Sequence, residues 1–418
     1  MNILVCGAEG FIGRALCDAL AREGHRVCRG VRHATREDEV GIDYTSDVVP
    51  ADWQSRLHAI DVVINAVGIL IERGDQTFDL IHRRAPIALF EAASRAGVRR
   101  IVQISALGAQ TGDTDYFASK RAADEYLQSL PVTHYILRPA LVYGTTGSSS
   151  RFFRAIASLP VHPLPAGGHQ LVRPIHIDEL AEIVARLVNT DAADQPVLDL
   201  VGGTQLEYGQ MLATYRASMA LPPAWRIGIP AFLVDAGAAL FDRVPNSMLT
   251  RDTWRMLQMG STGNVASTTK LLGRPPAGLE SFVAPVDEIP LRHAALAVWR
   301  PALLRGALAI MWIWAAVCSA FIYPQTASLA LLARVHLQGG AALAVLYLAA
   351  ALDFAFGIAT LVRPGRHLWA MQIGLISAYS IVIAVALPEF LWHPFGPILK
   401  NVPILALLLV LFSEETRS

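Results

Sequence analysis

The sequence predicts an α/β protein in which a doubly wound parallel sheet with a small cap subdomain is followed by an all-α bundle of four membrane spans. Two observations support this prediction. Short apolar strands alternate with amphipathic helices through roughly the first third of the chain. Charged residues number 60 in the first 300 positions but only 10 in the last 118. A soluble α/β part is therefore expected to precede a membrane part.

The first strand and helix are predicted most clearly. Residues 2–6 (NILVC) form a short apolar stretch ended by Gly7, and residues 11–23 place apolar side chains at helical spacing before Gly24. Further strands are predicted at 26–32, 60–64, 100–105 and 133–138, and further helices at 79–96 and 116–130. This alternation, with glycine-marked turns, is typical of a doubly wound sheet. We assign residues 1–144 to it.

The composition changes at about residue 145, where Gly, Ser, Pro and His become frequent. Sheet elements are expected to return within 175–201, as a helix at 178–189 and a strand at 196–201. The remaining segments up to residue 285 are amphipathic and broken by Pro. We therefore assign residues 145–298 to a cap that carries the substrate region. Arg151, Arg154 and Arg173 are candidates there to meet a phosphate or carboxylate, with a solvated surface role equally open.

Residues 299–418 are predicted to form the membrane part. The expected spans are 304–323, 337–362, 367–388 and 396–413. The last is the weakest, because Pro397, Lys400 and Pro403 interrupt it. Aromatic residues near the span ends suggest an interfacial belt: Trp312, Trp314, Tyr323, Trp369 and Trp392.

Orientation follows from the loop at 363–367 (RPGRH), whose two arginines place it in the cytoplasm. With four spans, the soluble part and both termini are then cytoplasmic, and the chain is a multi-pass protein of the inner membrane. Asp353 lies inside an apolar span, where a carboxylate costs about 2.5–3.5 kcal/mol to insert. We expect it to pair with Arg334, His336 or a neighbouring span, and favour a structural contact over a proton or quinone-related role.

Composition also excludes some functions. The 35 basic and 35 acidic residues balance, so a basic surface for nucleic acid is not indicated. The four cysteines form no CxxC pair, and no His/Cys cluster has the spacing of a metal site. We expect no metal.

The segment 7–13 (GAEGFIG) follows a strand and opens a helix, as a dinucleotide-binding turn does. Gly7 would allow the tight turn, Gly10 the approach of a pyrophosphate, and Gly13 close packing of helix and strand. The helix N-terminus would supply N–H donors and a positive dipole end. The end of the second strand offers Arg32, with Arg36 nearby, and no acidic residue. Arginine suits a 2′-phosphate, so NADP(H) is favoured over NAD(H).

A second motif supplies acid–base chemistry. Tyr116 and Lys120 stand four residues apart and share one helix face. A nearby ammonium lowers a tyrosine pKa toward a useful range, so that the phenol can exchange a proton as hydride moves. Ser105 ends the preceding strand and could orient the same substrate oxygen.

With these pieces in order, the chain resembles the short-chain dehydrogenase/reductase superfamily in its extended and atypical branches, the NAD(P)-dependent epimerase/dehydratases. The resemblance covers residues 1–285. It rests on the segments 7–13 (GAEGFIG), 65–68 (NAVG), 116–120 (YFASK), 137–144 (LRPALVYG) and 176–180 (HIDEL), and on Asp43 in GIDYTSD and Ser105. Within the superfamily, the chain looks closest to bacterial relatives of the Rossmann-fold accessory subunit of respiratory complex I. Residues 300–413 resemble a DoxX-like four-helix domain.

The resemblance implies a role for each matching residue. Tyr116 would be the acid/base, Ser105 its partner, and Lys120 the contact to the nicotinamide ribose. The implied cofactor contacts are Gly7, Gly10, Phe11, Ile12 and Gly13 at the pyrophosphate, Arg32 at the 2′-phosphate, Asp43 at the adenine, Ala66 and Gly68 at the adenosine ribose, and Pro139 near the nicotinamide amide. His176 and Asp178 match a largely structural motif. Only eleven positions separate Ser105 from Tyr116, which is short for the extended branch.

Three functions remain open at this point. The favoured one is a membrane-anchored NAD(P)H-dependent oxidoreductase with a small-molecule substrate, lipid-soluble or sugar-nucleotide-like, of which an epimerase or dehydratase is a variant. The alternative is a non-catalytic dinucleotide sensor or accessory subunit that docks a membrane-protein partner. The third is a transporter whose nucleotide-binding part is regulatory. Only Asp353 and the apolar spans support it. Contact with membrane lipids is expected in each case.

Overall fold

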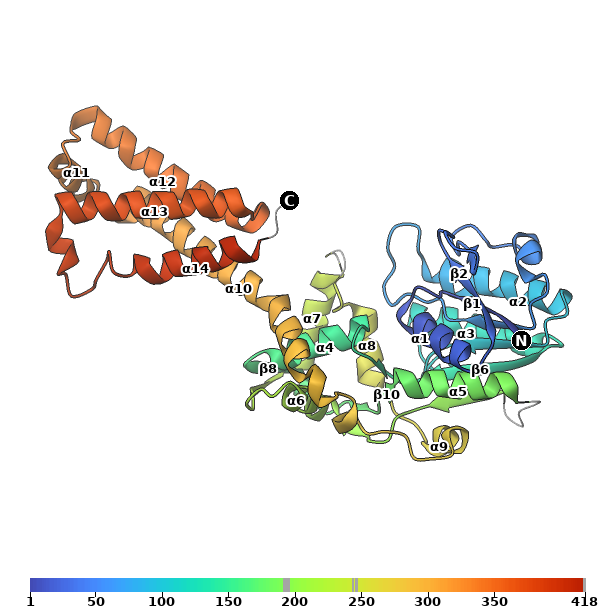
Figure 1. The fold of residues 1–418 in the computed structure, drawn as a ribbon. Coiled ribbons are helices and arrows are strands. Elements are labelled where there is room, and N and C mark those ends of the chain that lie inside the picture. The colour runs from blue at the N-terminus through green and yellow to red at the C-terminus, as the bar shows by residue number, and fades with distance from the viewer. Residues whose placement is uncertain (191–195, 243, 245–246, 416–418) are drawn as a thin grey trace. The chain divides into compact units, whose positions relative to one another are not determined.

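The computed structural model describes residues 1–190, 196–242, 244 and 247–415, and it divides into two compact units, Met1–Ala295 and Leu296–Ser418. This division lies three residues before the boundary expected from the composition. The last residues of the predicted membrane part, 416–418, lie outside the described chain. Figure 1 shows the order of the elements along the chain.

The first unit is built on a seven-stranded, fully parallel sheet. Its strands are β1 (Asn2–Cys6), β2 (Arg26–Val31), β3 (Glu39–Gly41), β4 (Val62–Asn65), β5 (Arg100–Ile104), β6 (Thr133–Pro139) and β11 (Val197–Leu200). Their spatial order is β11-β6-β5-β4-β1-β2-β3. The order reverses direction at β1 and β4, and ligands of doubly wound sheets bind at such a switch point. The predicted doubly wound parallel sheet is confirmed.

Helices cover both faces of the sheet because alternate residues of its strands are apolar on both sides. Ile3 and Val5 of β1 pack with α1 (Phe11–Arg22) and α5 (Ile177–Asn189). Leu4 and Cys6 face the opposite side, toward α2 (Ala85–Arg95) and α3 (Asp115–Ser129). A π-helical turn, Asp79–Arg84, leads into α2, so the helix predicted at 79–96 begins irregularly.

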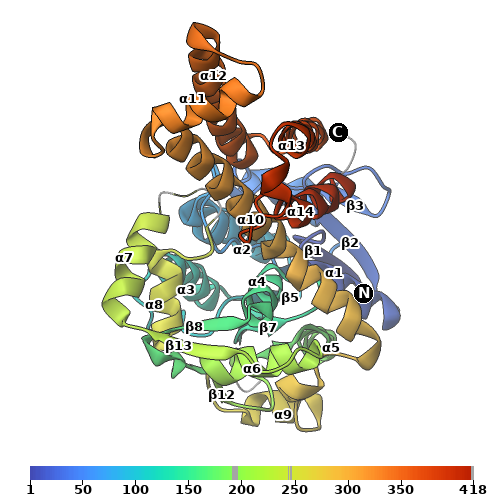
Figure 2. The ribbon, with the colours of Figure 1, turned by 90° about the vertical axis from the view of Figure 1, so that its left-hand side faces the viewer.

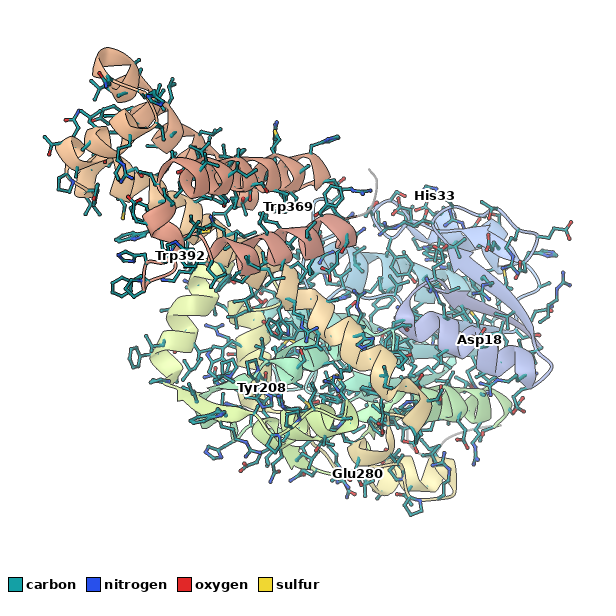
Figure 3. All side chains as sticks on the ribbon, turned by 60° about the vertical axis from the view of Figure 1, so that its left-hand side comes forward. Asp18, His33, Tyr208, Glu280, Trp369 and Trp392 are labelled. Carbon is teal, nitrogen blue, oxygen red and sulfur yellow. The ribbon has the colours of Figure 1, made fainter. Side chains whose placement is uncertain are left out.

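The cap contains α4 (Ser148–Ser158), α6 (Tyr208–Ser218), α7 (Ala231–Phe241), α8 (Arg251–Met259) and α9 (Ala266–Leu272). Strand β8 (Val161–Pro165) pairs in parallel with β13 (Trp225–Ile229). Two further strand pairs, β7 (Val142–Tyr143) with β10 (Ile175–His176) and β9 (Leu171–Val172) with β12 (Leu206–Glu207), connect cap and sheet segments. Tyr208, labelled in Figure 3, is buried in the apolar core of the cap.

The second unit is helical. Its main helices are α10 (Glu288–Val317), whose first turns belong to the first unit, α12 (Gly339–Val362), α13 (Arg366–Ala386) and α14 (Asn401–Glu414). Among the described residues, three helical stretches are long and apolar enough to cross a membrane: Pro285–Ile322, Gly339–Val362 and Arg366–Ala386. They match the first three predicted spans. A short helix, α11 (Gln325–Arg334), follows Pro324 and was not predicted.

The fourth predicted span, 396–413, is not confirmed at its full length among the described residues. Helix α14 has 14 residues and would rise about 21 Å, less than the roughly 30 Å of a hydrocarbon core. The segment before it contains Pro394 and Pro397, which remove backbone donors, and the helix starts only at Asn401. Pro403 is tolerated because it lies in the first turn.

The proposed aromatic belt is also corrected in part. Trp369 is fully buried and donates a hydrogen bond to Glu415 (3.0 Å), and Trp312 donates to Gln372 (2.9 Å) inside the bundle. Both indoles therefore stabilise helix contacts instead of lining an interface. Trp314, Tyr323 and Trp392 remain exposed, and Figure 3 labels Trp392 in the loop before α14.

Asp353 is buried on α12, and its Oδ1 has no hydrogen-bond partner among the described residues. The expected pairing with Arg334 is wrong, because that guanidinium forms an ion pair with Glu389. On the same helix, Gly357 allows close packing: a Cβ there would lie 3.2 Å from the carbonyl oxygen of Ala309 in α10. Small residues permit such close approach of membrane helices.

Candidate active site

The turn between β1 and α1 can only be made by glycine at two positions. Gly7 has φ +83°, a conformation that L side chains rarely adopt. A Cβ on Gly13 would lie 2.0 Å from the carbonyl oxygen of Gly7, so the first turn of α1 packs directly on the end of β1. The backbone of the turn thus lies at the carboxyl edge of the sheet, and no side chain separates Gly7 from Gly13 in the first turn of α1.

This turn leaves an anion site at the N-terminus of α1. The N-cap residue, Gly10, has no side chain to accept hydrogen bonds from the N–H groups of Phe11, Ile12 and Gly13. The first turn of α1 contains no acidic residue, so the positive end of the helix dipole is not neutralised. The ring of Phe11 packs against Gly144 and Gly147, and its backbone stays available to a ligand. These features fit a pyrophosphate.

Arg32 directly follows β2 and is exposed. When the side-chain amide of Gln76 is turned so that its oxygen faces Arg32, that oxygen accepts hydrogen bonds from the guanidinium. Arg36, the second candidate, is held by an ion pair with Asp38 (3.0 Å). Arg32 thus faces a neutral partner, whereas the charge of Arg36 is offset by Asp38, and Arg32 is the better candidate for a 2′-phosphate.

Asp43 accepts hydrogen bonds from the backbone N–H of Thr45 (2.9 Å) and from its hydroxyl (2.7 Å), and these bonds lower the pKa of the Asp43 carboxyl. The side chain is thus fixed as an anion in a local turn next to β3. Its second oxygen is the one left for an adenine.

Behind β4, sequence reasoning missed a buried amide network. Tyr44 donates to Asn65 (2.8 Å), whose side-chain nitrogen donates to Gln103 (2.8 Å) on the neighbouring strand. Asn65 also accepts from the backbone N–H of Val67 (3.2 Å). This network fixes the segment 66–68, which contains the predicted contacts Ala66 and Gly68.

Lys120 reaches that same segment from α3. Its ammonium donates to the carbonyl oxygen of Ile104 (3.2 Å) at the end of β5, and a Cβ on Gly68 would lie 3.2 Å from its Nζ. The structure therefore brings two predicted site residues, Lys120 and Gly68, into contact. Burial lowers the pKa of Lys120 to about 8.

Tyr116 lies one turn before Lys120, with its ring packed edge-on against Phe78, His82 and Phe117. Burial raises the pKa of Tyr116 to about 12, with a smaller contribution from the negative charge of Asp124. The phenol is therefore protonated at neutral pH.

His82 was not predicted from the sequence. Its Nε2 accepts a hydrogen bond from the backbone N–H of Ile69 (3.0 Å), so the hydrogen is on Nδ1, which contacts the hydroxyl of Ser119 (3.1 Å). Burial holds the pKa of His82 well below its usual value. The neutral imidazole joins the loop after β4 to α3 and supports the ring of Tyr116.

Ser105 has a different partner from the one expected. Its hydroxyl donates to the buried carboxylate of Asp124 (2.7 Å), which pairs with Arg138 (3.3 Å). The hydroxyl proton is therefore used within the protein, and the oxygen can act toward a ligand only as an acceptor. Asp124 stands one turn beyond Lys120, on the same face of α3.

The remaining predicted residues make contacts within the protein. The carbonyl oxygen of Pro139 at the end of β6 accepts from the N–H of Leu107 (3.0 Å). Two of the cap arginines donate to backbone carbonyls. Arg154 bonds Gly144 and Thr145, and Arg173 bonds Gly202, Gly203 and Gly263. They bind loops together and use part of their donors within the protein, while Arg151 is exposed.

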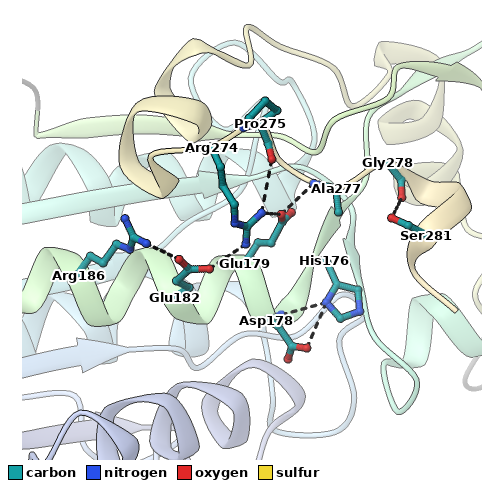
Figure 4. A network of polar contacts seen from close by, with 10 residues as sticks. All are labelled: His176, Asp178, Glu179, Glu182, Arg186, Arg274, Pro275, Ala277, Gly278 and Ser281. Carbon is teal, nitrogen blue, oxygen red and sulfur yellow. Dashed lines mark hydrogen bonds and ion pairs between the residues drawn. The ribbon is translucent and has the colours of Figure 1, made fainter. Parts of the chain in front are cut away.

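Figure 4 shows the polar contacts that fix α5. His176 accepts from the N–H of Asp178 (3.3 Å) and caps α5, as the sequence suggested for a structural motif. Glu179 accepts from Arg274 (2.7 Å) and from the N–H of Ala277 (2.8 Å). These contacts join segments about 95 residues apart, which no local pattern could reveal.

Comparison with known proteins agrees with this geometry. Residues 7–156 match a family model described as NAD(P)H-binding, and residues 309–409 match the DoxX-like family. The chain joins an NAD(P)H-binding Rossmann domain to a DoxX-like domain.

Two curated relatives show what this first unit resembles. A ceramide reductase of Caulobacter vibrioides is 30% identical over 206 residues, covering 48% of this chain and 63% of the relative. Subunit 9 of the NADH dehydrogenase [ubiquinone] 1 alpha subcomplex of Arabidopsis thaliana is 27% identical over 262 residues, covering 58% and 64%. The chain thus spans less than two thirds of the length of both relatives.

Solved structures share the fold. A UDP-glucuronic acid 4-epimerase from Bacillus cereus, solved with UDP-glucuronic acid and NAD, has a TM-score of 0.53 at 17% identity and covers 69% of this chain and 99% of its own. A human epimerase family protein with NADPH has a TM-score of 0.51 at 19% identity, covering 71% and 99%. At these identities the likeness concerns the fold alone.

Proposed function

We propose that this protein is a membrane-anchored, NADP(H)-dependent oxidoreductase that reduces a carbonyl group on a lipid-soluble substrate. The observation that carries the proposal is the placement of half-buried Tyr116 and buried Lys120 on one face of α3 at the carboxyl edge of the sheet. There Lys120 donates to Ile104 at the end of β5 and lies against Gly68 in the loop after β4. The glycine turn at the same edge supplies the anion site that a dinucleotide needs.

The residues divide the chemistry between them. Bound NADPH would supply a hydride to the carbonyl carbon. Tyr116 would donate its phenolic proton to the carbonyl oxygen, so that the product is an alcohol and the phenolate is reprotonated from solvent. The high pKa of Tyr116 keeps this proton in place before reaction. The ammonium of Lys120 would stabilise the phenolate and hold the nicotinamide ribose.

NADP(H) is favoured over NAD(H) because Arg32 follows β2 where an acidic residue would select NAD(H). Gly7, Gly10 and the N–H groups of Phe11, Ile12 and Gly13 would hold the pyrophosphate. Asp43 would contact the adenine, Ala66 and Gly68 the adenosine ribose, and Pro139 the nicotinamide.

A lipid-soluble substrate is supported by two features. One relative is named a ceramide reductase, and the site is fused to a DoxX-like domain with apolar helices. The two arginines of the loop at 363–366 favour a cytoplasmic position for that loop. The nucleotide-binding unit would then lie on the cytoplasmic side of the inner membrane, where reduced cofactor is available.

The reaction is tested by isotope transfer. The full chain in lipid nanodiscs is incubated with NADPH deuterated at nicotinamide C4 and with ketone-containing lipids, and the lipid product is analysed by mass spectrometry. The proposal expects an alcohol that is three mass units heavier than the ketone. Two units come from the addition of two hydrogens, and the third arises because one of them is deuterium. Oxidation of cofactor without deuterium in any lipid would contradict it.

The pH dependence of kcat/KM should report the protonation state of Lys120. Because its pKa is about 8 in the folded chain, the ammonium is present below pH 8 and lost above it. The value of kcat/KM for NADPH reflects the free enzyme, so it should be level below about pH 7 and fall roughly tenfold per unit above pH 8. Steady-state rates across this range give the profile. A Lys120→Arg variant should move the fall to higher pH, and an unchanged profile would contradict the role.

A second candidate is a non-catalytic dinucleotide-binding subunit of a membrane complex. The likeness to a subunit of NADH dehydrogenase favours it, as does the phenol pKa of about 12, which makes Tyr116 a weak proton donor. Purification of the chain with a membrane-protein partner and a stoichiometric dinucleotide that neither exchanges nor is oxidised would support this function.

A further inference from the structure

Helix α7 of the cap is apolar on all sides. Its sequence is AFLVDAGAALF, and one side packs on α8, where Val234 and Ala238 lie against the buried ring of Trp254. The only charged residue of the helix, Asp235, accepts a hydrogen bond from the indole nitrogen of Trp254 (2.6 Å). Because this carboxylate is used toward α8, the opposite side of α7 carries no charge.

That opposite side is exposed. Phe232 and Leu240 are 68% and 61% exposed, and they share a helix face because they are eight residues apart. Strand β13, which leads directly into α7, adds Trp225 and Ile227, which are 81% and 57% exposed and point to the same side of the strand. Figure 2 shows α7 on the outer side of α8. We call Trp225, Ile227, Phe232, Leu233 and Leu240 the α7 face.

An apolar face of this kind marks a contact surface, because a helix that is hydrophobic all round is normally buried. Helix α10 indicates what this face contacts. Leu291 and Ala295, in the first turns of α10, are part of the apolar core of the cap. The same helix continues into the first candidate membrane span. The nine residues 296–304 rise about 14 Å in a helix, so a short length of chain tethers the cap to the bilayer.

We propose that the α7 face inserts into the interfacial layer of the bilayer from which α10 emerges. Its composition fits this layer: Trp225 and Phe232 are aromatic residues of the type enriched at membrane interfaces, and Leu233 and Leu240 supply the apolar side of an interfacial helix. The inserted face holds the cap against the lipid from which a lipid-soluble substrate would be drawn. Only this last consequence depends on the proposed function.

The test measures immersion directly. The full chain, with Cys28 and Cys318 replaced by serine, receives a nitroxide label at Leu240→Cys and is reconstituted into phosphatidylglycerol/phosphatidylcholine vesicles. Collision rates with oxygen, which concentrates in hydrocarbon, are compared with those of a water-soluble nickel chelate. The matched control is Val49→Cys, an apolar position in the sheet domain that is 50% exposed.

The proposal expects the label at Leu240 to collide more often with oxygen than with nickel, and the label at Val49 to show the reverse. Adding Phe232→Glu should shift the Leu240 label toward water without changing the midpoint of thermal unfolding, since Phe232 is exposed. Equal, water-like accessibility at both positions would overturn the proposal. Low accessibility to both reagents with spin–spin broadening would also overturn it, because a second copy would then cover the face. The readout needs no turnover, so it stands apart from the enzymatic proposal.

Discussion

Replacing Tyr116 by phenylalanine is expected to lower kcat by about 10²–10⁴-fold, the usual contribution of a positioned acid. The substitution removes only the hydroxyl, and the ring can keep its edge-on contacts with Phe78, His82 and Phe117. The Kd for NADPH should therefore stay within about twofold. Stopped-flow cofactor oxidation and equilibrium titration on the full chain in nanodiscs measure the two quantities.

The matched control for this change is Tyr126→Phe on the same helix. Tyr126 donates to Glu91 (3.1 Å) away from the site, so its loss should leave kcat unchanged. If Tyr116→Phe retains turnover within a few fold of the natural chain, Tyr116 is not the proton donor and the dinucleotide-binding subunit becomes the better account.

Replacing Gly13 by alanine is expected to remove cofactor binding. The new Cβ would lie 2.0 Å from the carbonyl oxygen of Gly7, and since both groups are backbone-fixed, α1 must move away from β1. The N–H groups of Phe11 and Ile12 then lose their position. We expect affinity for NADPH to fall at least about 100-fold, or about 2.7 kcal/mol, by fluorescence titration.

Gly41→Ala provides the control, because a Cβ at Gly41 meets nothing within 4 Å. The unfolding midpoint without cofactor shows whether Gly13→Ala still folds, and circular dichroism shows whether its secondary structure is retained. A folded Gly13→Ala protein that binds NADPH like the natural chain would place the dinucleotide elsewhere.

The sheet and its helices could be predicted because their signals are local. Apolar strands such as 2–6 are bounded by glycines, and the spacing of Gly7, Gly10 and Gly13 encodes a turn whose geometry depends only on neighbouring residues. The Tyr116–Lys120 pair is similarly local, since helical spacing alone places both side chains on one face.

The contacts that could not be predicted join distant segments. Asp124 binds Ser105 and Arg138 from different elements, and His82 joins the loop after β4 to α3. Arg154 and Arg173 looked available because a sequence does not show which carbonyls will surround a guanidinium. The fourth span had enough apolar residues, but prolines shorten the helix that they form.

The most direct test of the central claim is the affinity of the full chain for NADPH, NADP⁺, NADH and NAD⁺, compared between the natural chain and Arg32→Ala. Binding to the folded state should raise stability by about 2.7 kcal/mol at a hundredfold excess of ligand over Kd. We expect NADPH and NADP⁺ to bind more tightly than NADH and NAD⁺ by at least about tenfold, or about 1.4 kcal/mol, and Arg32→Ala to remove that difference. Failure of all four dinucleotides to bind would contradict both the anion site at α1 and the oxidoreductase built on it.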